Sequence, residues 1–274
     1  MVKTGSIVVS PLGAVLIACL GLFAVPVGTG ADETIYCTQY ITSVPYTITQ
    51  AGHYCLIRNL TSGMASGTAI RIAADNVWLD LNNFALDASA AGSGTTAWGI
   101  SAENRSHVTV RNGLVLGFLN GVVFDGDAST SDLTVEKIRA DKNTRSGILV
   151  RGGDGIVVRE NRVANTGGTT LVNLTGTTGL AIVGTATVVN NEVVNTFTVN
   201  PQPGNLAYGI AFGGPPGAEY KAVAIDNRVT NSTDVGIACN QPPTSEVVLR
   251  DNIVLGAPAA YAGACTAIGT TNYP

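Results

Sequence analysis

Charged residues are scarce in this 274-residue sequence, since only 12% of the positions are Asp, Glu, Lys or Arg. The 15 Lys and Arg are scattered without a run, and the formal net charge is −4. A protein that binds nucleic acid needs a clustered basic surface to neutralise phosphates, so this composition predicts no nucleic-acid partner. Hydrophobic residues make up 45% of the chain, which is too large a fraction for a disordered protein.

Histidine is also rare, and the patterns that bind zinc are missing. The chain has two His, His53 and His107, and no Cys-x-x-Cys or Cys/His spacing typical of a zinc site. We interpret His53 as a structural hydrogen-bonding residue, so any histidine-dependent mechanism would depend on His107. These absences leave carboxylates, Lys and Arg as the main candidates for chemistry.

Glycine is abundant, with 33 residues, and together with Val, Ile and Thr it forms an internal repeat. Residues 146–166, SGILVRGGDGIVVRENRVANT, contain three short strand-like runs separated by a Gly-rich turn and a Glu-Asn turn. The glycine that opens this unit recurs at positions 99, 121, 147, 179, 209 and 236. A unit of this length has no room for a helix and must stack on its neighbours to bury its apolar residues. The repeat therefore predicts an all-β fold, a single-stranded parallel β-helix of about seven turns with three strands per turn.

Alternation within the opening strand of each unit separates an inner from an outer face. The side chains expected to point inward are Ile100, Val122, Phe124, Ile148, Val150, Leu180, Ile182, Ile210 and Phe212. Those expected on the outer face are Arg71, Ser101, Val123, Leu149, Ala181, Ala211 and Ala238. An Asn recurs at the second turn, at positions 161, 191, 227 and 252, and amides stacked at strand spacing predict a structural ladder. Lys137 interrupts the series, so we expect the ladder to break there.

The N-terminus has the layout of a signal peptide. Lys3 is the only early charge, an apolar stretch covers residues 12–25, and small residues lead up to Ala31. We predict that residues 1–31 are a cleaved signal peptide and that the mature protein is secreted or periplasmic, without a membrane partner. We also expect it to be monomeric. Two alternatives stay open, because residues 7–27 are about long enough to span a membrane and the residues up to Cys19 resemble a lipoprotein signal.

Cysteine usage supports export. Removal of residues 1–31 leaves Cys37, Cys55, Cys239 and Cys265, an even number that suits an oxidising compartment. Four Cys allow three pairings, but Cys239 and Cys265 are 26 residues apart, which is one turn of the repeat. The spacing therefore predicts a Cys239–Cys265 disulfide and leaves Cys37 to pair with Cys55. We divide the mature chain into an N-terminal cap at 32–68 with its own disulfide and a β-helix at 69–274.

The pattern Gly-Ile-x-Val, Val-Val-Arg-Glu-Asn-Arg-Val, Asn resembles the right-handed parallel β-helix proteins of the pectate-lyase-like superfamily. The resemblance covers about three quarters of the chain, from Ala69 onward, and implies a right-handed coil. Enzymes of this superfamily are polysaccharide lyases, glycoside hydrolases and uronate epimerases, with a groove along the first sheet. Their catalytic signatures do not carry over, because the sequence has no Asp-Asp, Gly-His-Gly or Asp-Pro-His-Asp, and residues 137–139 reverse the Arg-Ile-Lys motif.

One outward cluster carries groups suited to catalysis. Glu103, Asp125 and Arg151 fall at equivalent places on three successive turns, ~4.8 Å apart. For a lyase acting on uronic acids, Arg151 would neutralise the substrate carboxylate or act as the base, and Glu103 with Asp125 would hold calcium. In an inverting hydrolase the same two carboxylates would flank a water. The alternative is an exposed charge ladder that stabilises the fold by ~0–1 kcal/mol per pair.

Four further residues are candidates for substrate binding. Lys142 and Arg145 lie in an adjacent turn and would neutralise an acidic sugar, while Trp98 and Tyr208 would stack on sugar rings or seal loops against the coil. Together with the resemblance, these residues favour an exported protein that binds or cleaves an acidic polysaccharide. The small apolar residues of the outer face favour a second hypothesis, a non-catalytic surface or periplasmic protein that binds a glycan or a protein partner.

Overall fold

The structure is a computed structural model that describes residues 37–171, 176–199, 205–213, 219–240 and 245–267. The chain divides into two units, residues 1–35 and 36–274, and all described residues belong to the second. The signal peptide expected at residues 1–31 and the alternatives that involve residues 7–27 and Cys19 lie outside the described residues. No helix in the described ranges is long and apolar enough to cross a membrane.

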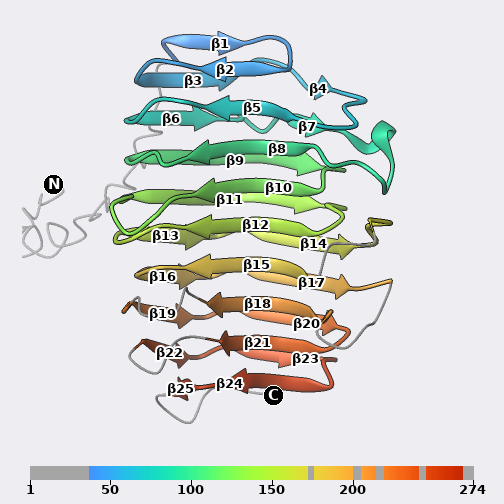
Figure 1. The fold of residues 1–274 in the computed structure, drawn as a ribbon, viewed down its shortest axis with the longest axis vertical. Coiled ribbons are helices and arrows are strands. Elements are labelled where there is room, and N and C mark those ends of the chain that lie inside the picture. The colour runs from blue at the N-terminus through green and yellow to red at the C-terminus, as the bar shows by residue number, and fades with distance from the viewer. Residues whose placement is uncertain (1–36, 172–175, 200–204, 214–218, 241–244, 268–274) are drawn as a thin grey trace, which may run out of the picture. The chain divides into compact units, whose positions relative to one another are not determined.

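The described chain is all-β apart from one short 3₁₀ turn at Ser89–Ala91, and it winds into a parallel coil of about eight turns (Figure 1). Its opening strands form one nine-stranded parallel sheet. In order across the sheet they are β2 (Tyr46–Ile48), β5 (Thr68–Ile72), β8 (Trp98–Glu103), β10 (Asn120–Asp125), β12 (Ser146–Arg151), β15 (Thr177–Val183), β18 (Ala207–Gly213), β21 (Val235–Asn240) and β24 (Ala259–Gly263).

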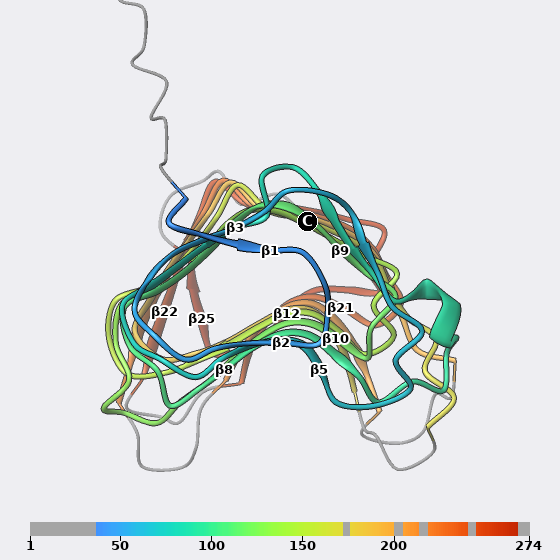
Figure 2. The same cartoon turned by 90° about the horizontal axis from the view of Figure 1, so that it is seen from above.

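The second and third strands of the turns form a sixteen-stranded parallel sheet, which lies opposite the first sheet when the coil is viewed from above (Figure 2). Its main path is β1 (Gln39–Ile41), β3 (Gly52–Leu56), β6 (Val77–Asp80), β9 (Val108–Leu116), β11 (Leu133–Asp141), β13 (Ile156–Arg159), β16 (Ala186–Val189), β19 (Lys221–Ile225), β22 (Glu246–Arg250) and β25 (Cys265–Ala267). The third strands are β4 (Leu60–Thr61), β7 (Ala85–Asp87), β14 (Arg162–Gly167), β17 (Glu192–Phe197), β20 (Arg228–Ser232) and β23 (Ile253–Leu255). The predicted β-helix is confirmed, although the second and third strands merge into β9 and β11 in two turns.

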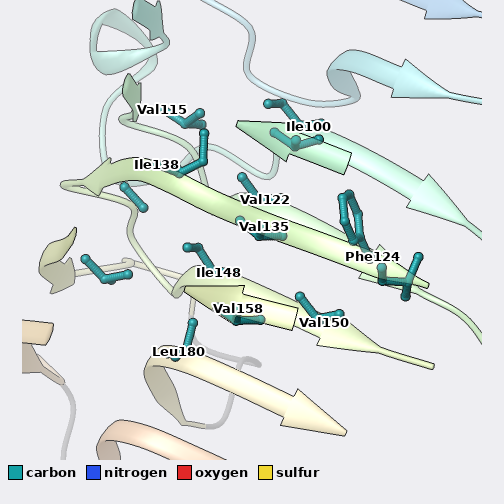
Figure 3. Close-up of a cluster of buried hydrophobic side chains, with 14 of the residues drawn as sticks. Ile100, Val115, Val122, Phe124, Val135, Ile138, Ile148, Val150, Val158 and Leu180 are labelled. Carbon is teal, nitrogen blue, oxygen red and sulfur yellow. The ribbon is translucent and has the colours of Figure 1, made fainter. Parts of the chain in front are cut away.

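Like side chains stack along the interior, as the alternation predicted. Ile100, Val122, Ile148 and Leu180 are in register on neighbouring strands and are fully buried (Figure 3). The other residues predicted to point inward from the first sheet are buried as well. Each buried aliphatic side chain stabilises the fold by ~1.5–3 kcal/mol relative to exposure, so the stack is the main source of stability. Not all the residues predicted to point outward are exposed to solvent. Ser101, for example, is only 1% exposed.

The asparagines of the second turn form a buried amide ladder. Asn161 donates to Asn191 at 3.0 Å, Asn191 to Asn227 at 2.9 Å and Asn227 to Asn252 at 2.9 Å, each from Nδ2 to the next Oδ1. The ladder ends where the sequence predicted a break, but the residue at the Asn position is Ile138, whose backbone N–H donates to Asn161 Oδ1. The left-handed backbone belongs to the residue before each Asn, such as Glu160 with a φ of 55°.

Both predicted disulfides are present, Cys37–Cys55 and Cys239–Cys265. The segment expected to cap the coil supplies β1 to β4, and these strands pair in parallel with the turn that follows. Tyr46 is in register with Ile70 in the first sheet. The cap at 32–68 therefore continues both sheets, and its boundary stays a prediction.

Candidate functional site

The first sheet brings the three predicted catalytic residues together at the ends of adjacent strands. Glu103, Asp125 and Arg151 are direct neighbours in register on β8, β10 and β12. Arg151 Nη1 donates to Asp125 Oδ1 at 2.8 Å, and Arg71 on β5 contacts Glu103 Oε2 at 3.4 Å. All four side chains are about half exposed. Each carboxylate thus faces a guanidinium, and solvent limits each pair to ~0–1 kcal/mol.

Calcium does not fit this pair of carboxylates as they stand. Calcium needs six to eight oxygen ligands, whereas Glu103 and Asp125 are each engaged by an arginine. Within the described residues, no three acidic, His or Cys side chains come close enough to hold one metal ion. The calcium role of these two residues stays a prediction, and we derive no chemistry through it.

A cleft of about 220 Å³ opens beside Arg151, beyond the end of the first sheet. Its floor is backbone, because Gly152, Gly153 and Gly184 have no side chain to fill it. A Cβ on Gly184 would lie 2.3 Å from the carbonyl oxygen of Gly152, so only glycine allows this close approach. The cleft lies between residues 126–128, 151–154, 183–185 and 219–220.

The walls of the cleft carry carboxylates and one buried tyrosine. Asp127, Asp154 and Glu219 line it, together with Tyr220, which is 5% exposed. Hydrogen bonds from the side chain and backbone of Ser129 lower the pKa of Asp127, and burial raises the pKa of Tyr220 to about 12. Sequence reasoning did not assign these residues, although the lengthened turns that hold them were visible as irregular spacing of the repeat.

The predicted substrate-binding residues lie along the edge of the first sheet at which its strands begin, opposite the edge at which the strands end. Trp98 and Tyr208 are both half-buried. They lie four strands apart, because Trp98 is in register with Asn120, and the register continues through Ser146 and Thr178 to Tyr208. This separation is about 19 Å at ~4.8 Å per strand.

Arg145 stands midway along this edge, immediately before β12. Its backbone N–H donates to Leu119 at 2.8 Å and its carbonyl accepts from Thr178 at 3.0 Å, so its place in the coil is fixed. The side chain is half-buried, and burial lowers its pKa. The guanidinium has no ion pair or side-chain hydrogen bond within the described chain. Lys142, three residues earlier, is exposed in a turn with a φ of 54°.

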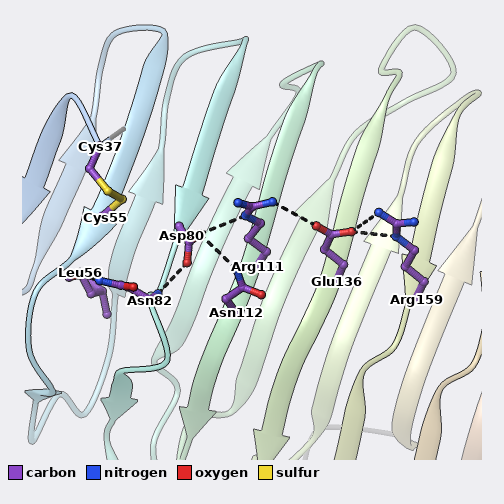
Figure 4. Close-up of polar contacts among 9 residues, drawn as sticks. All are labelled: Cys37, Cys55, Leu56, Asp80, Asn82, Arg111, Asn112, Glu136 and Arg159. Carbon is purple, nitrogen blue, oxygen red and sulfur yellow. Dashed lines mark hydrogen bonds and ion pairs between the residues drawn. A yellow bond between two sulfur atoms is a disulfide. The ribbon is translucent and has the colours of Figure 1, made fainter. Parts of the chain in front are cut away.

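A second polar array, which the sequence did not reveal, crosses the outer face of the sixteen-stranded sheet (Figure 4). Asp80 and Arg111 are joined at 3.0 Å, Arg111 and Glu136 at 3.6 Å, and Glu136 and Arg159 at 2.7 Å. The side chains of Asp80 and Arg111 are 13% exposed and that of Glu136 is 8% exposed. Because the members neutralise one another, this charged column is a structural feature and offers no free group to a ligand.

Trp78 extends the charged column toward the N-terminus. The Arg111 guanidinium lies 5.5 Å from the Trp78 ring centroid, and the His53 ring stacks on Trp78 at 5.4 Å. The indole therefore has a partner on each neighbouring strand. The His53 ring is held by this stacking, and the hydrogen bonds of His53 with Thr38 are made by its backbone. His107 contacts Asp132 at 3.0 Å away from the predicted site.

The sequence profile of the right-handed β-helix region matches residues 46–214, well over half of the chain. This protein belongs to the right-handed β-helix family. The coil described above is therefore right-handed, as the resemblance implied. A comparison with curated proteins gives no match.

Two solved structures resemble this right-handed β-helix over 85% of its chain. The Dettilon tailspike protein has a TM-score of 0.50 and 12% identity, and the catalytic unit of the thermostable GH87 α-1,3-glucanase from Streptomyces thermodiastaticus has 0.32 and 14%. The chain covers 62% of the tailspike chain and 61% of the glucanase chain, less than two thirds of either. The likeness to the tailspike supports the fold alone.

Proposed function

We propose that this right-handed β-helix protein is exported and binds an acidic polysaccharide along the edge of the first sheet where β8 to β18 begin. The observation that carries the proposal is the half-buried Arg145 guanidinium, which has no acidic partner in the described chain. A desolvated cation without a partner is unfavourable, and a carboxylate that binds it recovers that free energy.

The neighbours of Arg145 suit a polymer rather than a small anion. Trp98 and Tyr208, about 19 Å apart along the edge, offer half-buried rings that favour the apolar faces of sugars. The planar guanidinium between them suits bidentate contact with the carboxylate of a uronic acid. Lys142 adds an exposed cation in the preceding turn.

The two disulfides support export. Cys37–Cys55 and Cys239–Cys265 both close within the coil, and such bonds persist in oxidising compartments outside the cytosol. A secreted or periplasmic location would give the protein access to cell-surface and extracellular polysaccharides.

The test compares polygalacturonate and alginate with uncharged dextran in binding measurements on the wild type and on two variants. We expect the acidic polymers to bind, dextran not to bind, and Arg145→Gln to weaken binding roughly tenfold. The matched control is Arg139→Gln, which removes an exposed arginine on β11 and should leave affinity unchanged. Equal binding of dextran, or an unaffected Arg145→Gln variant, would overturn the proposal.

Cleavage of the same class of polymer is a second candidate, favoured by the meeting of Glu103, Asp125 and Arg151 on adjacent strands. The reaction would be detected as new absorbance from unsaturated uronate for a lyase, or as new reducing ends for a hydrolase. Asp125→Asn and Arg151→Gln should each abolish the activity. An absence of activity on pectate, alginate and glycosaminoglycans, with calcium present, would reject cleavage and leave a non-catalytic binding protein.

A further inference from the structure

A hollow of about 200 Å³ lies at the edge of the first sheet where its strands begin, the same edge as the proposed polymer site. Its lining includes Ser89 and Ser93 in the loop before β8, Lys142 and Thr144 before β12, and Gly168 after β14. Thr144 immediately precedes Arg145 in the chain. The hollow therefore adjoins the place where we propose that a guanidinium binds a uronate carboxylate.

The charge of the hollow suits the same acidic polymer. No Asp or Glu of the described chain lines it. The cation in its lining, Lys142, is exposed and has no ion pair within the described residues. A polymer whose carboxylate is held at Arg145 therefore meets no repulsion here and gains a second cation.

The size and polarity of the hollow suit a small neutral substituent. Pockets that enclose a whole small molecule measure ~300–1,000 Å³, so this smaller hollow accepts a group that projects from a larger ligand. Its surface is mostly apolar, because glycine backbone forms much of it. A sulfate ester would lose its hydration there, with only Lys142 and the hydroxyls of Ser89 and Ser93 to replace it. An acetyl group instead buries its methyl and needs one donor for its carbonyl oxygen.

Both walls of the hollow are held in place by the coil. Gly117 has a φ of 78°, and a Cβ there would lie 2.4 Å from the backbone N of Ser89, so only glycine lets the loop before β8 lie this close. On the opposite wall, the backbone N–H of Thr169 donates to the carbonyl of Thr144 at 3.1 Å. Binding therefore requires little ordering of these segments.

We propose that this hollow is a subsite for an acetyl group of the acidic polysaccharide, linked through oxygen to a uronic acid or through nitrogen to a neighbouring hexosamine. The acetyl methyl packs on the glycine backbone, a serine hydroxyl donates to the acetyl carbonyl, and Lys142 pairs with a nearby carboxylate. The inference rests on the proposed function, and it gives that function a preference for acetylated polymers.

The experiment measures the affinity of the full chain for two pairs of polymers by isothermal calorimetry. O-acetylated alginate is compared with the same alginate after deacetylation, which leaves its charge unchanged. N-acetylated heparosan is compared with its N-sulfated form, which carries a sulfate in place of the acetyl group. We expect the acetylated member of at least one pair to bind roughly tenfold more tightly, through a buried methyl and one added hydrogen bond. The pair that responds shows whether the acetyl group is linked through oxygen or nitrogen.

Two variants test whether the preference arises in the hollow. Ser89→Phe and Ser93→Phe each add a ring to its lining. Each should lower the affinity for the preferred acetylated polymer to that of the other member of its pair, whose own affinity stays unchanged. The matched control is Ala90→Phe, because Ala90 is exposed in the same 3₁₀ turn as Ser89 but does not line the hollow.

Three outcomes would overturn the acetyl subsite alone: equal affinities within both pairs, tighter binding of the N-sulfated polymer, or a preference for acetylated polymer that both Phe variants retain. Arg145→Gln should weaken both members of a pair alike, which separates the polymer site from the subsite. If no acidic polymer binds the wild type, the proposed function and this inference are rejected together.

Discussion

Each asparagine of the amide ladder satisfies backbone and side-chain groups of two turns at once. Asn191 Nδ2 donates to the carbonyl of Val158 at 2.9 Å, and its Oδ1 accepts from both the backbone N–H and the Nδ2 of Asn161. All of these groups are buried, so no water replaces a lost partner. The ladder therefore links successive turns of the coil through buried hydrogen bonds.

Asn191→Ala should lower the free energy of unfolding by about 3 kcal/mol, because it leaves several buried groups unpaired. Urea denaturation followed by circular dichroism measures the change. The neighbouring Asn190→Gly variant is the control, since Asn190 is exposed with a φ of 54° that glycine adopts without strain. A decrease in unfolding free energy below about 1 kcal/mol in Asn191→Ala would show that the amide ladder contributes little to stability.

The glycine that opens each repeat has a packing reason. A Cβ on Gly147 would lie 2.3 Å from Val163 Cγ1 and 2.8 Å from the carbonyl oxygen of Gly179. Gly147→Ala should therefore destabilise the protein by about 1–3 kcal/mol, through displaced strands rather than lost contacts. Gly63→Ala should be neutral in the same thermal-unfolding assay, since a Cβ on Gly63 meets nothing within 4 Å.

At the scale of elements, the charged column joins β6, β9, β11 and β13 across the outer face of the sixteen-stranded sheet. Glu136 is its centre, in contact with Arg111 on one side and Arg159 on the other. Glu136→Gln should lower the free energy of unfolding by about 1–3 kcal/mol, because Arg111 stays largely buried with fewer compensating charges.

The control for the charged column is Glu160→Gln. Glu160 contacts Lys137 at 3.9 Å, and both side chains are about half exposed, so its removal should change stability by less than about 1 kcal/mol. Equal effects of the two Glu→Gln variants in denaturant titrations would mean that burial of the column contributes nothing.

The sequence was sufficient to place β8, β10, β12, β15, β18 and β21 in the first sheet and to identify the inner residues of the first five. The reason is that side chains alternate along each strand and an opening glycine marks where each strand starts. It also placed Glu103, Asp125 and Arg151 side by side, since they lie at the same distance after that glycine. Strands of the second sheet follow turns of different length. Their register, and with it the column of Asp80 and Arg111, therefore could not be derived from spacing.

The candidate site was predictable only in part, for a different physical reason. Arg145 was recognised as a cation near the sheet, but its lack of a partner depends on where every nearby carboxylate points. The cleft lies where Gly152, Gly153 and Gly184, which have no side chains, meet Tyr220 from a later turn. The glycines are visible in the sequence, but their meeting depends on how turns of unequal length stack.

At the scale of the whole coil, each turn contacts mainly the turns before and after it, so stability is approximately a sum of neighbouring terms. The Cys239–Cys265 disulfide spans 26 residues and should contribute about 3.5 kcal/mol on the chain-entropy model. Replacing both cysteines by Ser should therefore loosen the last turns without loosening the middle of the coil.

Hydrogen exchange measured by mass spectrometry tests this locality. The Cys239→Ser, Cys265→Ser variant should exchange faster in β22 and β25, with β10 to β14 unchanged. The matched Cys37→Ser, Cys55→Ser variant should instead accelerate exchange in β1 and β3. Uniform acceleration along the chain in either variant would show that the coil unfolds as one cooperative unit.

The amide ladder and the charged column lie in different parts of the coil. The ladder runs from Asn161 to Asn252, and the column runs from Asp80 to Arg159, so they overlap only at the turn of β13. Ionic strength screens Coulomb attraction but has little effect on hydrogen bonds between neutral amides. Because the column is largely buried, salt screens it far less than it screens an exposed pair such as Arg162 and Glu192. Both the column and the ladder should therefore keep their strength in concentrated salt, and only the exposed ion pairs on the surface of the coil should weaken.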